Sequence, residues 1–222
     1  ATGADGDITA AGVATLTNKT LTSPKINEDV VLTSTATELN LLDGKAATNL
    51  ALIGKTGGTN FTSSLLVGHA TTGTLDAAQY NTGVGDSALD ALTSGDLNTT
   101  IGFNAGSSIT SGQKNVAIGA WSLKTSDGGT GNTAVGTYSQ KDATGTGDFN
   151  TSLGYDSLQD VTGDYNIGIG KGAGDNILGG DGNVIIGGIN ADSATGDKQL
   201  IIADGVDGSV AWVKGDSSGN VS

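Results

Sequence analysis

A short pattern of polar and hydrophobic positions recurs along the chain from residue 64 onward. The pentapeptides NTGVG, NTTIG, NVAIG, NTAVG, NTSLG, NIGIG and NVIIG begin at Asn81, Asn98, Asn115, Asn132, Asn150, Asn166 and Asn183. Successive asparagines are 17, 17, 17, 18, 16 and 17 residues apart, and SLLVG at Ser64 is a degenerate first copy. Eight repeats therefore run from about Ser64 to Gly187, and such a period is typical of solenoid proteins.

Each pentapeptide reads as a short β-strand. The residue after the asparagine is Thr, Val or Ile, and the residue three after it is always aliphatic: Val84, Ile101, Ile118, Val135, Leu153, Ile169 and Ile186. These two positions share one face of a strand because side chains alternate between faces. Glycine then turns the chain, and a small residue seven after the asparagine lies in a predicted second short strand. Two strands and two turns in 17 residues predict one coil of an all-β parallel roll or solenoid.

Stacked coils place equivalent residues above one another at about 4.8 Å. The seven asparagines would then form a ladder in which each side chain binds a turn amide and its neighbour. Each coil would enclose Ala, Gly and Ser with a single aliphatic side chain, which makes an isolated chain marginal in stability. We therefore expect a homotrimer whose shared core is the column of seven aliphatic side chains.

The flanks lack the repeat. Residues 1–63 contain a strand-like alternation at 13–21, and a capping box at 35–38 followed by leucines predicts a short helix near 36–43. Residues 189–222 contain two strand-like runs separated by DGVDG, which predict a hairpin that caps the last coil. The expected organisation is a docking or shaft segment at 1–63, the β-roll at 64–188 and a C-terminal cap at 189–222.

Composition narrows the function. The chain has 222 residues, a net charge of −13, no cysteine and a single histidine. It therefore lacks thiolate and multi-histidine metal sites, and its acidity argues against nucleic-acid partners. No apolar run approaches the ~20 residues that span a bilayer, so membrane insertion is not expected. The segment GIGKGAG superficially matches a glycine-rich phosphate loop, but its glycines fall on repeat positions. The only glutamates, Glu28 and Glu38, both lie in residues 1–63, which argues against a carboxylate pair for glycoside hydrolysis in the roll. We expect no catalytic site, metal or cofactor; a polysaccharide depolymerase is a distant alternative.

Four aromatic residues fall on one predicted outer edge of the roll. Phe103 and Tyr155 directly follow the glycine of their coil, and Trp121 and Tyr138 come one place later. Aromatic side chains stack on ligands and anchor interfaces. They are candidate receptor contacts, and the alternative is that they pack against a neighbouring chain.

The repeat resembles those of bacteriophage tail-fibre proteins and the head repeats of trimeric autotransporter adhesins. The segments ATLTNKTLTSPKI and TATELNLLDG before it, and KQLIIA and AWVKGD after it, are similar to stretches in phage fibres. The resemblance implies a trimeric tail fibre on the virion surface. Such a fibre would bind other virion proteins through residues 1–63 and a host polysaccharide or protein elsewhere. A capsid head fibre or decoration protein, or a bacterial adhesin passenger, are the alternatives.

Overall fold

The computed structural model describes residues 54–56, 60–68, 72–145 and 147–222. These residues form thirteen strands and no helix. The helix predicted near 36–43 lies outside them. The strands are β1 (Gly54–Thr56), β2 (Phe61–Thr62), β3 (Leu65–Val67), β4 (Ala78–Gln79), β5 (Thr82–Val84), β6 (Thr99–Ile101), β7 (Val116–Ile118), β8 (Thr133–Val135), β9 (Thr151–Leu153), β10 (Ile167–Ile169), β11 (Val184–Ile186), β12 (Leu200–Ala203) and β13 (Ala211–Gly215).

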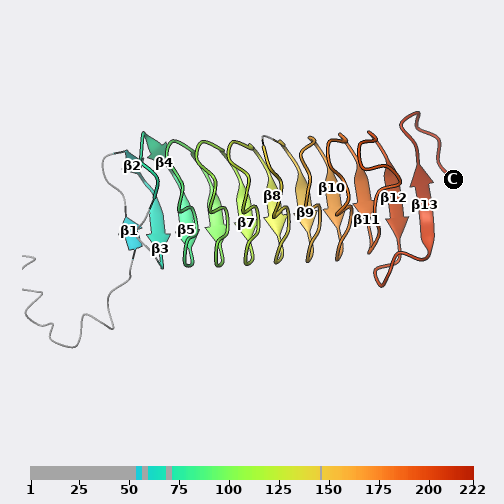
Figure 1. Ribbon diagram of the computed structural model, residues 1–222, viewed down its shortest axis with the longest axis horizontal. Helices are drawn as coiled ribbons and strands as arrows, with labels where there is room; N and C mark the ends of the chain where they lie inside the picture. The colour runs from blue at the N-terminus through green and yellow to red at the C-terminus, as the bar shows by residue number, and fades with distance from the viewer. Residues whose placement is uncertain (1–53, 57–59, 69–71, 146) are drawn as a thin grey trace, which may run out of the picture. The chain divides into compact units, whose positions relative to one another are not determined.

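Eleven of these strands form one sheet, in the order β1-β3-β5-β6-β7-β8-β9-β10-β11-β12-β13. From β3 to β12 all neighbours are parallel, and each repeat strand pairs with its equivalent in the next repeat, as Val116 does with Thr133. Figure 1 shows the successive strands lying side by side, each one turn of the chain further along. The predicted all-β solenoid with a period of about 17 residues is therefore confirmed.

Each coil holds one sheet strand, and the predicted second strand is replaced by turns in the repeats from β5 to β11. The reason lies in the backbone, because in the repeats from β5 to β10 the residues six and eight after the asparagine have positive φ. In the third full repeat these are Trp121 at 56° and Leu123 at 49°. Residues that alternate between left-handed and right-handed conformations cannot form an extended strand. Their N–H groups bond instead to neighbouring coils. Trp121 N–H donates to the Phe103 carbonyl of the preceding coil at 2.8 Å, and Leu123 N–H donates to the Ser139 carbonyl of the following coil at 2.9 Å.

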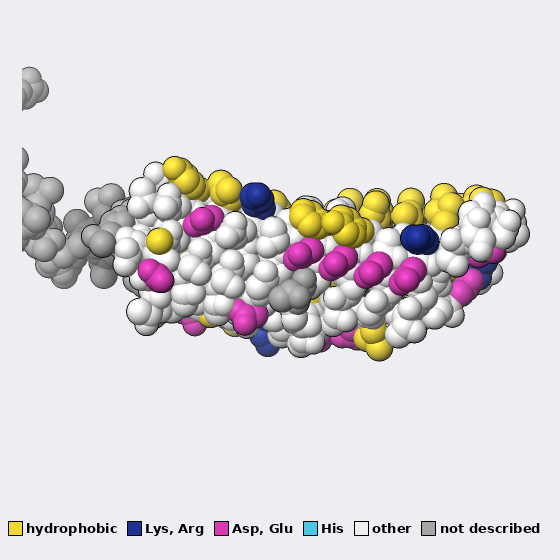
Figure 2. Space-filling model, turned by 90° about the horizontal axis from the view of Figure 1, so that it is seen from above, with side chains coloured by type: hydrophobic (Ala, Val, Ile, Leu, Met, Phe, Trp, Pro, Cys, Tyr) yellow, Lys and Arg dark blue, Asp and Glu magenta, His cyan; other side chains and the backbone are white. Residues whose placement is uncertain are grey.

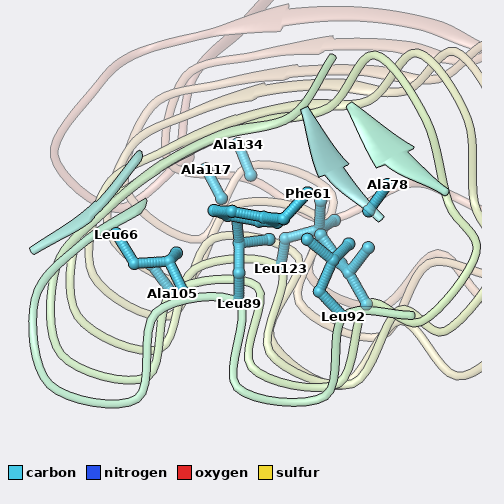
Figure 3. Close-up of a cluster of buried hydrophobic side chains, with 10 residues drawn as sticks. Phe61, Leu66, Ala78, Leu89, Leu92, Ala105, Ala117, Leu123 and Ala134 are labelled. Atoms are coloured by element: carbon cyan, nitrogen blue, oxygen red, sulfur yellow. The ribbon is translucent and has the colours of Figure 1, made fainter. Parts of the chain in front are cut away.

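The interior of the coils contains more aliphatic side chains than the repeat predicts. The middle residue of each repeat strand from β5 to β11 is buried and is small in all but β11, where it is Ile185, and the small residue seven after the asparagine is buried as well. Larger residues eight and eleven places after the asparagine join them, and they divide into two clusters. Phe61, Leu66, Leu89, Leu92 and Leu123 belong to the first (Figure 3), and Leu158, Val161, Ile177, Ile185 and Ile201 belong to the second.

Polar side chains separate the two clusters. Ser139, Gln140 and Ser152 are all buried at the level of β8 and β9. Gln140 Nε2 donates to Ser152 Oγ at 2.8 Å and to the Thr133 carbonyl at 3.1 Å, and the hydroxyls of Ser139 and Ser152 bond to each other. The core thus consists of two hydrophobic segments separated by a layer of polar side chains that are hydrogen-bonded to one another.

A glycine ends every strand of the repeat because neighbouring coils approach each other closely there. At Gly119, φ is +132° and an added Cβ would lie 2.6 Å from the backbone carbon and oxygen of Gly136. Equivalent glycines follow one another as far as Gly187, where a Cβ would lie 2.3 Å from the Ala203 oxygen. We call this set, Gly85, Gly102, Gly119, Gly136, Gly154, Gly170 and Gly187, the glycine column. Ala203 occupies the next position, at the end of the parallel stack.

The stack extends one strand beyond the repeats recognised in the sequence. β12 pairs in parallel with β11, with Leu200 opposite Val184. β13 then pairs antiparallel with β12, and this hairpin is the predicted C-terminal cap. At the other end, β1 pairs antiparallel with β3, and β2 pairs with β4 in a separate two-stranded sheet.

Candidate interaction surfaces of the solenoid

The asparagines of the repeat form a continuous hydrogen-bonded ladder inside the coils. Oδ1 of each one accepts the backbone N–H of the next at 2.9–3.0 Å. Nδ2 donates at 2.7–2.9 Å to the carbonyl of the glycine that precedes the next asparagine by three. All seven side chains, Asn81, Asn98, Asn115, Asn132, Asn150, Asn166 and Asn183, are buried.

Other side chains extend this ladder at both ends. Ser64 Oγ accepts the N–H of Asn81 at 2.8 Å, and Gln199 donates its N–H to Asn183 Oδ1 at 2.9 Å. Gln199 therefore takes the asparagine position of the coil that contains β12. The repeat does not reveal this residue, because glutamine breaks the pentapeptide pattern and the spacing shortens to 16 residues.

The aliphatic side chains predicted for a shared core lie on the outer face of the sheet. Five of them are between 37% and 49% exposed, and Val135 and Ile186 are partly buried. We call this set, Val84, Ile101, Ile118, Val135, Leu153, Ile169 and Ile186, the outer column. The residue two positions before each of them is Thr, Val or Ile, so this face of β5 to β11 carries no charged side chain.

The four candidate receptor residues, Phe103, Trp121, Tyr138 and Tyr155, form a second column, the aromatic column. Trp121 stacks on Tyr138 with 5.1 Å between ring centroids, and the two outer pairs meet edge to face at 5.2 and 5.6 Å. Lys141 Nζ lies 5.4 Å from the Tyr138 ring centroid. Trp121 and Tyr138 are therefore largely engaged within the chain, while Phe103 and Tyr155 are 43% and 46% exposed.

Acidic side chains adjoin the aromatic column. Burial raises the pKa of Asp156 and Asp160 above the usual aspartate value. At Asp142, burial is outweighed by hydrogen bonds from Gln159 and Lys141, so its pKa is lowered. The ammonium of Lys141 lies 3.1 Å from the carboxylate of Asp142. This edge of the coils therefore offers carboxylates, an amide and an ammonium group beside exposed rings.

A line of aspartates two places before the asparagine was not singled out in the sequence. Oδ1 of Asp164 accepts the N–H of Asp148 at 2.8 Å, and Oδ1 of Asp181 accepts the N–H of Asp164 at 2.8 Å. Asp197 continues the series, accepting from Asp181 at 2.9 Å. A row of acidic side chains is visible on the surface in Figure 2. Their regular spacing in the sequence is the feature that could have identified them. Their hydrogen bonds connect each coil to the next.

Within the described part of the chain, no group of three or more His, Cys, Asp or Glu side chains is placed to hold a metal ion. The same residues include no helix of the length and apolarity that a membrane span requires. The outer column and the aromatic column are the two candidate interaction surfaces. Comparisons with models of protein families, with curated proteins and with solved structures find no match to this chain.

Proposed function

We propose that this chain is a structural segment of a bacteriophage virion fibre, a tail fibre, that assembles as a homotrimer and contributes to host-cell attachment. The observation that carries the proposal is the outer column, a row of partly exposed aliphatic side chains running across seven adjacent strands. At about 4.8 Å per strand, the row is roughly 30 Å long. Contiguous exposed apolar surface of this kind marks an interface.

Charge supports the same conclusion. The chain has a net charge of −13, yet the outer face of β5 to β11 carries no charged side chain. A solvated face of such an acidic protein would be expected to carry a share of that charge. Because every coil presents the same residues, three copies aligned in parallel can bury their outer columns against one another along the whole array.

The assignment to a virion rests on the resemblance of the repeats and of both flanks to phage fibres. In this proposal residues 1–63 bind other virion proteins, and the coils are exposed on the particle, where three copies sum weak contacts to a host polysaccharide or protein. No catalytic step is assigned to the chain. A capsid fibre or a bacterial adhesin passenger would use the same surfaces.

Native mass spectrometry of the purified chain and of Ile118→Asp tests the assembly. The expected result is a species of three times the 21.7 kDa chain mass, lost in Ile118→Asp while circular dichroism still reports a β-structure. Leu178→Asp, at an aliphatic residue that is 47% exposed and lies outside the outer column, is the matched control and should remain trimeric. A monomeric parent chain would overturn the trimer.

The biological role has a separate test. Purified chain should reduce adsorption of the corresponding phage to its host in proportion to receptor occupancy, and antibodies to the chain should label the tail in electron micrographs. Labelling of the capsid would favour the head-fibre alternative. Absence of label from virions would overturn the fibre assignment.

A further inference from the structure

The end of the aromatic edge of the solenoid contains a hollow of about 450 Å³. Its walls come from the turns that follow β10 and β11 and from the loop between β12 and β13. The position that holds Tyr155 in one coil holds Lys171 in the next and Gly188 in the one after. Gly188 adds no side chain, so the hollow opens where the column of side chains stops.

The wall formed by the β12–β13 loop is held firmly in place. Gly188 N–H donates to the Asp204 carbonyl at 2.9 Å, and a Cβ on Gly208 would lie 2.6 Å from the Gly188 oxygen. The Asp204 carboxylate accepts the N–H groups of several loop residues, including Val210 at 2.8 Å and Val206 at 3.0 Å. Backbone contacts thus hold this loop against the turn that carries Gly188.

The polar lining is chemically mixed. Lys171 supplies an ammonium group, Asp175 and Asp207 supply carboxylates, and Asn190 supplies an amide, while Ile189 and Val206 supply apolar surface. Burial, followed by the charges of Asp156 and Asp160, raises the pKa of Asp175, and the nearby amide of Asn190 acts in the opposite direction. Donors and acceptors spread around a small hollow with apolar patches match the alternating hydroxyl and C–H surface of a pyranose ring.

The charge of the lining disfavours anionic ligands. One lysine against two aspartates gives the lining a net negative charge, which disfavours phosphates, uronates and other anions. No group of three or more metal-ligating side chains occurs among the described residues. An uncharged polyhydroxyl ligand fits the mixed donors, acceptors and apolar patches of the lining.

Tyr155 extends the hollow by one coil. Its backbone carbonyl accepts the N–H of Gly172 at 2.8 Å, so the turn that carries Tyr155 lies directly beside the lining residues. The ring is 46% exposed, and its edge-to-face contact with Tyr138 engages at most one of its faces. A partly exposed aromatic ring next to a polar hollow can stack on the C–H face of a second sugar ring.

We propose that the hollow lined by Lys171, Asp175 and Asn190 binds an uncharged oligosaccharide, with one ring inside it and the next ring against Tyr155. The site is the host-glycan contact of the fibre, so this inference rests on the proposed function and names its ligand class and binding residues.

An array of immobilised oligosaccharides tests the site. It carries uncharged hexoses and N-acetylhexosamines together with uronate-containing counterparts of equal length, and it is probed with the full chain. Binding is expected to some uncharged members and to be absent from the uronates. Asp175→Asn, Asn190→Ala and Tyr155→Ala should each weaken binding about tenfold or more, since a hydrogen bond or a stacking contact is lost.

Matched controls come from the opposite edge of the strands. Tyr165→Ala removes a tyrosine that is 61% exposed, and Lys114→Ala removes an exposed lysine, and both should bind as the parent does. Circular dichroism of each variant establishes that it is folded, and Asn190 is itself exposed, so its replacement leaves the coils intact. Failure to bind any uncharged sugar, preference for uronates, or loss of binding only in Tyr165→Ala would overturn the site.

Failure of the site differs from failure of the fibre. The site would be refuted, and the proposed function would stand, if the chain is trimeric and antibodies to it label virions but Asp175→Asn does not change its effect on phage adsorption to the host. A chain that binds sugars through Asp175 yet is absent from virions would refute the fibre instead.

Discussion

A single oxygen atom of Asn98 binds Asn115 twice, because Oδ1 of Asn98 accepts both the backbone N–H of Asn115 at 3.0 Å and its side-chain amide at 3.1 Å. Asn115 also donates to the Gly129 carbonyl at 2.7 Å and accepts from Asn132 at 2.9 Å. One side chain thus connects three successive coils. It can do so only if it offers a donor and an acceptor at the same time.

Asn115→Asp should destabilise the chain strongly. The substitution replaces the donor to Gly129 by an oxygen and places a carboxylate at a buried site, so we expect a loss of at least about 3 kcal/mol in the free energy of unfolding. Urea denaturation measures it. Asn104→Asp, at a partly exposed residue outside the ladder, is the control and should change stability by less than about 0.5 kcal/mol. Equal effects at both positions would contradict the structural role of the ladder.

Gly119→Ala tests the close approach of neighbouring coils. The new Cβ would lie 2.6 Å from backbone atoms of Gly136, which cannot move without breaking the register, and φ at this residue is +132°. A loss of more than about 3 kcal/mol is expected in thermal or chemical unfolding. Gly179→Ala introduces a Cβ that meets nothing within 4 Å and should be neutral or slightly stabilising. A mild effect of Gly119→Ala would show that the coils are further apart than described.

Thr100→Val should stabilise the protein. The hydroxyl of Thr100 is buried without a hydrogen-bond partner, and the corresponding residues in the next two coils, Ala117 and Ala134, are apolar. Valine keeps the shape and removes the desolvated hydroxyl, which is worth about 1 kcal/mol. The midpoint of urea denaturation should rise with an unchanged slope. A decrease would mean that a water or an unseen partner satisfies the hydroxyl.

The C-terminal hairpin should open in acid. Hydrogen bonds from the backbone N–H groups of Val210, Asp207 and Val206 lower the pKa of Asp204 to about 2. Because this pKa is below the unfolded value of 3.8, the carboxylate stabilises the loop above pH 4, and this contribution is lost as the pH falls from about 4 towards 2. Hydrogen bonds from Asn220 and Ser218 lower the pKa of Asp216 as well, so it acts in the same direction.

Fluorescence of Trp212, measured in a Trp121→Phe background, follows this opening because Trp212 lies in β13. Asp204→Asn should remove most of the change between pH 4 and 2, and the double variant with Asp216→Asn should remove the rest. An acid transition of the same size in the double variant would show that other carboxylates control the hairpin.

The sequence was sufficient to predict the register of the sheet, because the spacing of the asparagines is the spacing of paired strands. It was insufficient to predict the interior, because the positions eight and eleven places after the asparagine can each supply the large side chain that fills a coil. Leu89 is buried eight places after its asparagine, whereas the equivalent Gly106 is covered by Ile109, whose Cδ1 would lie 2.8 Å from an added Cβ. Because the large side chain can come from either of two positions in a coil, neither position is regularly hydrophobic in the sequence.

The candidate sites were predictable to different degrees. The aromatic column follows from residue type and spacing, so its members could be named in advance. The glycan hollow depends on contact between Gly188 and Gly208, which lie 20 residues apart in a part of the chain without the repeat. Such a contact arises from the path of the loop, and no regular spacing in the sequence predicts it.

The parallel array ends at Ala203. Along the glycine column, the carbonyl oxygen of each coil lies where a Cβ on the preceding glycine would be, as the Ala203 oxygen does beside Gly187. Ala203 itself pairs with Ala211 of the antiparallel β13 and not with a further parallel coil. β13 therefore covers the strand edge that the first coil of a second molecule would have to join. A sheet built from identical units, which could otherwise polymerise end to end, is closed at this end by one reversed strand.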